Sequence, residues 1–139
     1  MKRVAFLVLT ITLVLLAVPN AQTPTNAAAL TIGAAAPEFE LKDLSGQSHS
    51  LKSYRGKPAV VTFLSARCPI SKAYQDRIRM LAEEYAKQNV AFIGINSSAD
   101  ESIEELRANA AENKLGFTIL KDDGNVVADV YAAERTPKV

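Results

Sequence analysis

The sequence predicts a three-layer α/β fold built around a central, mainly parallel sheet. Two runs rich in apolar and β-branched residues, 59–64 and 90–95, are typical of strands that are covered on both faces. Each run is followed by a segment in which apolar residues recur at helical spacing. Strands that alternate with helices in this way favour a sheet with helices packed on both sides.

Length and composition limit the classes of protein that fit. The chain has 139 residues, of which 48% are hydrophobic and 22% charged, as in one globular domain. Lys and Arg total 16 against 15 Asp and Glu, so we expect no nucleic-acid partner. One cysteine and one histidine argue against a Cys/His zinc site and an internal disulfide, and no acidic cluster has the spacing of a calcium loop. We therefore expect neither a metal nor a cofactor.

The N-terminus has the pattern of a secretory signal peptide. Lys2 and Arg3 precede an apolar run at 4–18, and Ala21 offers a small residue for cleavage. We expect residues 1–21 to direct export to the periplasm or the extracellular space, with no stable membrane insertion after cleavage. A retained membrane anchor is the alternative, although the run is shorter than the roughly 20 residues that span a bilayer. Residues 22–31 are expected to form a flexible lead-in to a domain at 32–139.

The first half of this domain is predicted to contain a hairpin, a core strand and a long helix. Residues 39–42 alternate apolar and polar side chains, Ser45-Gly46 is a turn signal, and residues 48–51 return as a second strand. The core strand at 59–64 leads to a helix at 69–88, because proline is favoured in a first helical turn. The apolar stripe of this helix, expected to face the core, consists of Tyr74, Ile78, Leu81 and Tyr85.

The second half continues the alternation. A core strand at 90–95 precedes a second helix, for which Ser98 and Glu101 are predicted to form a capping box. Residues 117–120 form a third core strand, and Asp122 and Asp123 are expected to be turn residues. A short helix at 126–132 follows and ends before Thr136-Pro137.

Cys68 is the candidate catalytic residue because a buried strand gives way to a helix at this point. A helix N-terminus stabilises a thiolate through its free N–H groups and its dipole. Arg67 and Lys72 are near enough in sequence to add positive potential. The alternative is an inert core cysteine, since free cysteines are often buried. The strand end and Pro69 favour the reactive thiol.

Four segments, in the right order, carry a resemblance to a known family. They are residues 32–39 (Ile-Gly-Ala-Ala-Ala-Pro-Glu-Phe), 56–71 around Cys68, 90–96, and 131–137 ending in Thr-Pro. Together they resemble the thioredoxin-like superfamily, and within it the redoxin branch of alkyl hydroperoxide reductase/thiol-specific antioxidant and peroxiredoxin-like domains. The resemblance implies a thioredoxin-like fold with a cis bond between Thr136 and Pro137 facing Cys68. It also implies a substrate-binding surface made of Pro69, Ser71, Thr136 and Pro137.

Some positions depart from the patterns of this superfamily. Ser71 stands where thioredoxins have the second cysteine of their CxxC pair, and Thr62 stands where they bury an acid. The peroxiredoxin motif Pro-x-x-x-Thr-x-x-Cys is matched by Ser65, which keeps a hydroxyl, but has Val61 at its proline position. By the resemblance, Ser65 and Arg135 would assist Cys68 in polarising a peroxide.

The expected function is that of a thiol oxidoreductase or antioxidant enzyme in which one cysteine, Cys68, acts on a peroxide or a protein disulfide, with the peroxide slightly preferred. An external thiol would serve as the reductant, because Ser71 offers no second thiol. The alternative is a non-catalytic module that binds or senses, or an inactive fragment. Thioredoxin-like domains continue past the cis-proline with a β-hairpin and a closing helix. We therefore expect the domain to be truncated after Pro137.

Overall fold

The structure is a computed structural model that describes residues 30–139, so the predicted signal peptide and residues 22–29 lie outside the described residues. The elements appear in the predicted order, with boundaries within two residues of the predicted ones except at the start of the second long helix. They are β1 (Glu40–Asp43), β2 (Ser48–Ser50), the 3₁₀ helix η1 (Leu51–Tyr54), β3 (Ala59–Phe63), α1 (Pro69–Ala86), β4 (Ala91–Asn96), α2 (Ile103–Glu112), β5 (Thr118–Lys121) and α3 (Val126–Val130).

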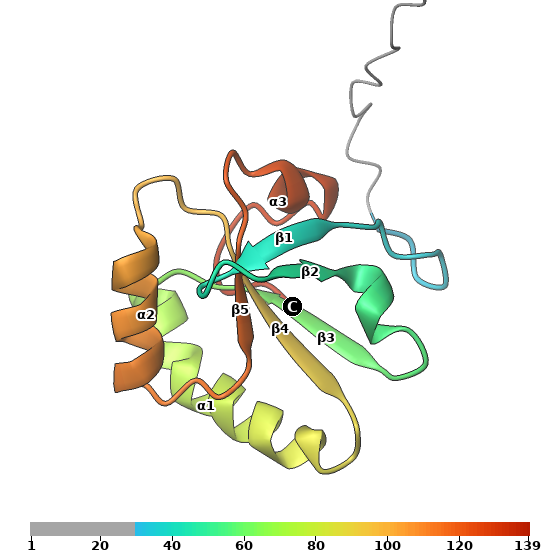
Figure 1. Ribbon diagram of the computed structural model, residues 1–139, viewed down its shortest axis with the longest axis horizontal. Coiled ribbons are helices and arrows are strands. Elements are labelled where there is room, and N and C mark those ends of the chain that lie inside the picture. Colours follow the sequence, from blue (N-terminus) through green and yellow to red (C-terminus); the bar gives the residue numbers. More distant parts are fainter. Residues whose placement is uncertain (1–29) are drawn as a thin grey trace, which may run out of the picture.

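The five strands form one mixed sheet in the order β2-β1-β5-β4-β3 (Figure 1). β3, β4 and β5 run parallel, whereas β1 is antiparallel to both β2 and β5. The α/β fold class is confirmed, but the sheet is half parallel and half antiparallel rather than mainly parallel. The antiparallel β1–β2 pair results from the tight turn between these two strands, where Gly46 adopts a φ of +94°. Such a turn can join only antiparallel strands.

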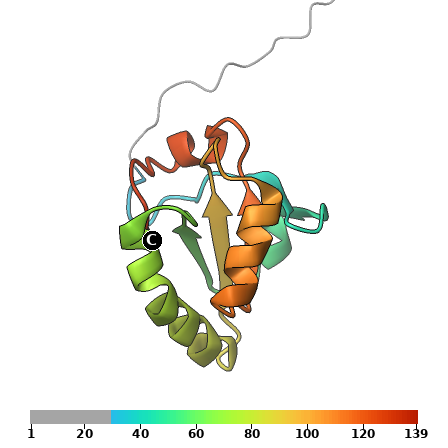
Figure 2. The same ribbon diagram turned by 90° about the vertical axis from the view of Figure 1, so that its left-hand side faces the viewer.

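Helices cover both faces of the sheet. Ile93 and Ile95 point to one face, where they pack with Val127 and Tyr131 from α3 and the residue that follows it. α1 and α2 lie on the other face, side by side in front of the strands in Figure 2. The side-chain amide of Gln75 donates to Asn109 at 2.9 Å and ties these two helices together. The predicted three layers are therefore present.

The buried face of α1 differs from the predicted stripe. Of the predicted residues only Ile78 is buried, and Tyr74, Leu81 and Tyr85 are 47%, 38% and 40% exposed. The buried residues are instead Ser71, Gln75, Ile78 and Ala82, which have the same 4-3-4 spacing shifted along the helix. Ser71 and Gln75 are polar, but each side chain has a hydrogen-bond partner inside the protein. Burying these two side chains therefore does not leave them without a hydrogen bond.

Two predictions about the ends of helices are wrong. α2 begins one turn later than the Ser98–Glu101 capping box required, because Ser102 is its N-cap and accepts from the N–H of Glu105 at 3.2 Å. Asp122 is not an ordinary turn residue, since it is 1% exposed. Its carboxylate accepts from the N–H groups of Val127 and Ala128, and so caps the start of α3.

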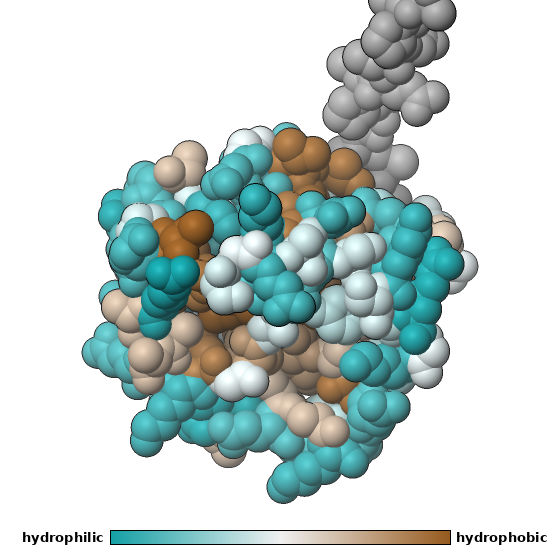
Figure 3. Space-filling model, in the orientation of Figure 1, coloured by the Kyte–Doolittle hydropathy of each residue, from teal (hydrophilic) through white to brown (hydrophobic). Residues whose placement is uncertain are grey.

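Within residues 30–139, no helix combines the length and the apolar character that crossing a membrane requires. The face shown in Figure 3 is largely hydrophilic, with apolar atoms at its recessed centre.

Candidate active site

Cys68 is the N-cap residue of α1, directly before Pro69 in the first helical turn. It is partly exposed and has no disulfide partner. The pKa of its thiol lies below the ordinary value, first because of the backbone N–H of Ser71, and further because of hydrogen bonding with the side chain of Thr136 and with the N–H of Ile70. Burial and the negative charge of Glu101 oppose this shift without cancelling it. The site therefore favours a thiolate, as the position at a helix N-terminus predicted.

The segment containing Thr136 and Pro137 faces the thiol. The peptide bond between these residues is cis, as predicted, and the Cys68 Sγ lies 3.5 Å from the carbonyl oxygen of Thr136. Next along the chain, Lys138 pairs with Phe63 of β3 through two reciprocal backbone hydrogen bonds of 2.8 and 3.3 Å. β3 thus holds this segment beside the cysteine.

A groove of about 410 Å³ lies next to Pro137. It is lined mainly by apolar side chains of α1 and of the last residues, namely Ile70, Tyr74, Arg77, Ile78, Leu81, Pro137 and Val139. Ile70 is two residues after Cys68 and is 60% exposed. The groove therefore offers an apolar surface that starts at Ile70 and Pro137, close in sequence to Cys68 and Thr136, although Cys68 itself does not line it.

The hydroxyl of Ser65 is directed into the protein. It donates to the carboxylate of Glu101, and its oxygen accepts from the backbone N–H groups of Cys68 at 2.9 Å and Arg67 at 3.2 Å. Ser65 is 6% exposed. Its proton is thus directed to a carboxylate, and the residue contacts the backbone of Cys68.

The remaining predicted site residues lie at different depths. Ser71 is completely buried, and its hydroxyl accepts from the N–H of Ser65 at 3.0 Å, so it is the backbone N–H of Ser71 that faces the thiol. Arg135 is exposed and makes no hydrogen bond or ion pair within the described part of the chain. The structure brings Ser65, Pro69, Ser71, Thr136 and Pro137 around Cys68, and it shows no contact of Arg135 with the cysteine.

The two cations near Cys68 in sequence differ in their surroundings. The guanidinium of Arg67 binds both carboxylate oxygens of Glu105, at 2.7 and 2.8 Å, and contacts Asp100 at 3.2 Å. Its charge is thereby neutralised by α2 and the preceding loop instead of being directed at the thiol. Lys72 makes no ion pair among the described residues.

Sequence reasoning missed Glu101, which is 3% exposed and lies against the loop that precedes Cys68. It accepts from the N–H groups of Ala66 at 2.8 Å and Arg67 at 3.1 Å. It also accepts from the Ser65 hydroxyl and, at 2.7 Å, from the side-chain amide of Asn96. Burial raises the pKa of Glu101, but these hydrogen bonds outweigh it, so the pKa is lowered overall. The sequence signal that could have identified Glu101 is Ser102, which is an alternative N-cap for the helix and would place Glu101 before it.

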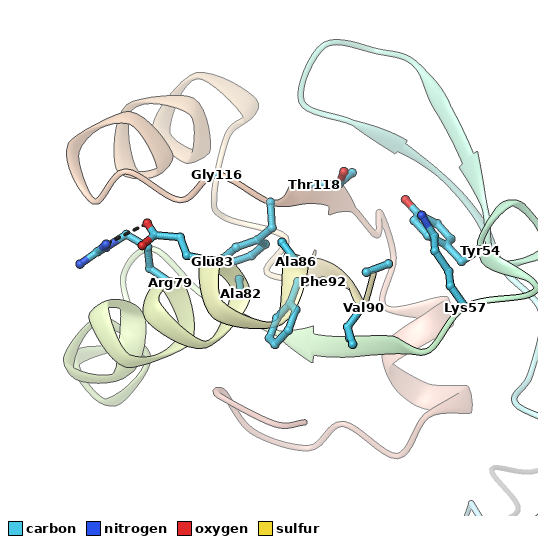
Figure 4. A pocket seen from close by; sticks show the side chains of 12 residues that line it. Tyr54, Lys57, Arg79, Ala82, Glu83, Ala86, Val90, Phe92, Gly116 and Thr118 are labelled. Carbon is cyan, nitrogen blue, oxygen red and sulfur yellow. Dashed lines mark hydrogen bonds and ion pairs between the residues drawn. The ribbon is translucent and has the colours of Figure 1, made fainter. Parts of the chain in front are cut away.

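A second pocket, of about 350 Å³, lies at the end of the sheet where β4 and β5 begin. Figure 4 shows Lys57 and Tyr54 on one side of it and the ion pair of Arg79 with Glu83 on the other. Its walls include the first residues of β4 and β5, whereas Cys68 follows the carboxyl end of β3. This pocket is therefore separate from the thiol site. Residues 30–139 contain no group of three or more His, Cys, Asp or Glu side chains placed to hold a metal ion.

Comparison with known proteins gives relatives of two kinds. The chain is 37% identical over 101 residues to the chloroplastic peroxiredoxin Q of Sedum lineare, covering 72% of this chain and 53% of that protein. It is 35% identical over 98 residues to the thioredoxin-like protein YneN of Bacillus subtilis, covering 70% of this chain and 57% of that protein. The chain thus spans about half the length of these curated relatives.

The structural comparison agrees with the sequence comparison. The crystal structure of a secreted disulfide oxidoreductase from Mycobacterium tuberculosis superposes with a TM-score of 0.64 and 29% identity, over 71% of each chain. This likeness, together with the helices on both faces of the sheet, confirms the expected thioredoxin-like fold. The AhpC/TSA family matches residues 32–139, which is the whole predicted domain. The chain belongs to the AhpC/TSA family.

Proposed function

We propose that this protein is a thiol oxidoreductase in which Cys68 exchanges with disulfides of peptide or protein substrates. The observation that carries the proposal is the position of Cys68 between the N-terminus of α1 and the carbonyl of Thr136, beside an apolar groove. A helix N-terminus favours the thiolate that attacks a disulfide. The groove and the backbone of the partly buried Thr136 suit an extended peptide that pairs as an added strand.

The proposed reaction has two exchange steps. The Cys68 thiolate attacks one sulfur of the substrate disulfide, a Cys68–substrate disulfide forms, and the other substrate sulfur leaves as a thiolate. An external thiolate then attacks the substrate sulfur of this mixed disulfide, which releases the Cys68 thiolate and leaves the substrate bonded to the external thiol. Since Ser71 offers no thiol, the second step is intermolecular.

A peroxidase is the second candidate, favoured by the likeness to peroxiredoxin Q. There the Cys68 thiolate would attack the O–O bond and form a sulfenic acid, while the leaving alkoxide takes up a proton. One external thiol would convert the sulfenic acid into a mixed disulfide and water, and a second would restore the thiol. The direction of the Ser65 hydroxyl towards Glu101 argues for ranking this reaction second.

Export is part of the proposal. Lys2, Arg3 and the apolar run at 4–18 support a signal peptide at 1–21, which would place the enzyme in the periplasm or the extracellular space. N-terminal sequencing of the mature protein tests this, and an intact Met1 on the exported product would contradict cleavage.

Trapping experiments separate the two reactions. The protein and its Cys68→Ser variant are mixed with a peptide disulfide, and separately with hydrogen peroxide, in the absence of reductant. We expect a mixed disulfide on the parent protein that Cys68→Ser does not form. Sulfenic acid formed far faster than on free cysteine, without a mixed disulfide, would favour the peroxidase. If neither product forms, the enzyme proposal is refuted and a binding module is the remaining explanation.

A further inference from the structure

A buried carboxylate holds the loop that carries Cys68. Glu101 gathers hydrogen bonds from the consecutive backbone N–H groups of Ala66 and Arg67, and from the hydroxyl of Ser65. These donors belong to the short loop between β3 and α1. Three donors from one loop converge on one side chain, so the position of the loop depends on Glu101.

Ser65 extends this connection to the cysteine itself. Its oxygen accepts from the backbone N–H of Cys68 at 2.9 Å while its proton is donated to Glu101. Glu101 is thus linked to the Cys68 backbone through a single intervening hydroxyl. Cys68 must keep its N-cap conformation, with φ of −65° and ψ of 119°, if its thiol is to face the first N–H groups of α1.

The counter-charge of this network comes from Lys121. It is 8% exposed and forms no ion pair among the described residues, but its ammonium donates to the side-chain oxygen of Asn96 at 2.8 Å and to the carbonyl of Ser98. The amide of the same Asn96 donates to Glu101 at 2.7 Å. One amide therefore lies between a buried cation and a buried anion. Both charges have hydrogen-bond partners, as buried charges require.

We propose that Glu101 is a positioning residue, whose ionised carboxylate fixes the Ser65–Cys68 loop and so keeps the thiol aligned with the N-terminus of α1. Asn96 and Lys121 hold the carboxylate in place. The proposal deepens the proposed function by naming what keeps its reactive group in position. It concerns the state of the thiol, and so it can be tested without any disulfide or peroxide substrate.

Two effects of Glu101 on the thiol have opposite signs, and this makes the proposal testable. As a negative charge, Glu101 raises the pKa of Cys68, so removal of the charge alone would lower that pKa. As a positioning residue, Glu101 maintains the contacts that lower the pKa of Cys68, so its loss would raise that pKa. The other charged groups near the thiol are Arg67, which is paired with Glu105, and Lys72.

The experiment measures the rate of Cys68 alkylation by iodoacetamide against pH in the intact chain. Glu101→Gln keeps the size of the side chain but offers only one acceptor oxygen to the loop. We expect its midpoint to rise by about half a pH unit or more, which is a threefold lower thiolate fraction below the midpoint. Ser65→Ala keeps the charge and breaks the link to Cys68, and we expect its midpoint to rise as well.

Glu104→Gln is the matched control. It removes an acidic charge from the exposed first turn of α2, where Glu104 makes no hydrogen bond or ion pair among the described residues. The Arg67–Glu105 pair stays intact, so the midpoint should stay where it is in the parent protein. A midpoint that falls in Glu101→Gln would show that only the charge acts, and an unchanged midpoint would show no influence; either result overturns the proposal. If Glu101→Gln does not fold, by circular dichroism, the midpoint of Ser65→Ala decides in the same way.

Discussion

The thiol of Cys68 and the carbonyl oxygen of Thr136 lie 3.5 Å apart, although 68 positions separate the two residues in the chain. The contact joins the start of α1 to the segment that pairs with β3. A substrate sulfur that approaches Cys68 must therefore pass close to the backbone at Thr136. In the proposed disulfide exchange, attack on the substrate sulfur and pairing with the substrate backbone would therefore occur at one point.

A second thiol at position 71 should convert the site to one that resolves its own mixed disulfide. In the Ser71→Cys variant the new thiol lies at the residue whose backbone N–H already contacts Cys68. We expect the Cys68–substrate disulfide to decay at least about tenfold faster than in the parent protein, because the attack becomes intramolecular. Quenched samples analysed by mass spectrometry give the decay rate. Equal lifetimes in both proteins would show that residue 71 cannot reach the mixed disulfide.

The apolar groove should matter for peptide substrates and not for small reagents. Ile70→Ser removes an apolar side chain beside Pro137, and we expect kcat/KM for a peptide disulfide to fall about five- to tenfold, or about 1 kcal/mol. Alkylation by iodoacetamide should be unaffected. Met80→Ser is the control, because Met80 is equally exposed at 60% on the same helix but lies outside the groove. A loss of the same size in both variants would contradict binding at the groove.

Gly94 should not tolerate a side chain. A Cβ at this position of β4 would lie 3.0 Å from Phe117 and 3.1 Å from Leu64. We expect Gly94→Ala to lower the free energy of unfolding by about 1–3 kcal/mol, measured by urea denaturation. Gly116→Ala serves as the control, because a Cβ there meets no atom within 4 Å and the backbone has no positive φ. Similar stability of Gly94→Ala and the parent would show that β4 and its neighbours can relax.

The turn between β1 and β2 should make stability depend on pH in the acid range. Hydrogen bonds from Ser45, and then from His49, hold the pKa of Asp43 well below its usual value. A carboxyl whose pKa is depressed by folding stabilises the fold above its unfolded value of 3.8, and this stabilisation is lost as the pH falls towards its folded value.

We therefore expect Asp43→Asn to be less stable than the parent protein at pH 7, and the difference to narrow steadily below pH 3.8. Urea denaturation at several pH values measures it. Asp123→Asn, in an exposed turn, is the comparison and should change little at any pH. A difference between Asp43→Asn and the parent that stays constant into acid would rule out the carboxylate as its source.

Hydrophobic patterns in the sequence identified the strands of the core and the reactive position. The runs at 59–64 and 90–95 correspond to β3 and β4, and hydrophobic patterning reveals such strands directly. β4 lies between β5 and β3, whereas β3 is the last strand in the order and is bridged at Phe63 by Lys138. Cys68 and Pro69 mark the boundary between strand and helix by residue type alone. These features are local, so the sequence is sufficient to predict them.

Polar residues that are buried through long-range contacts were not predictable in this way. Gln75 lies inside because Asn109 of another helix accepts its amide hydrogen, and neither residue indicates its partner in the sequence. The spacing of Ser98 and Glu101 predicts a capping box, because a local sequence pattern describes only residues that are close in the chain. The true partners of Glu101 lie about 35 positions earlier in the chain and become visible only when β3 and β4 are paired.

The reciprocal hydrogen bonds between Phe63 and Lys138 have a mechanical consequence for the site. Cys68 follows Phe63 by five positions and Thr136 precedes Lys138 by two. Both residues of the site are therefore connected by short segments to the same backbone pair. A displacement of β3 would therefore carry Cys68 and Thr136 in the same direction. The distance between them depends on this pairing and on the contacts of the Cys68 loop with Glu101 and with Glu105 at the start of α2.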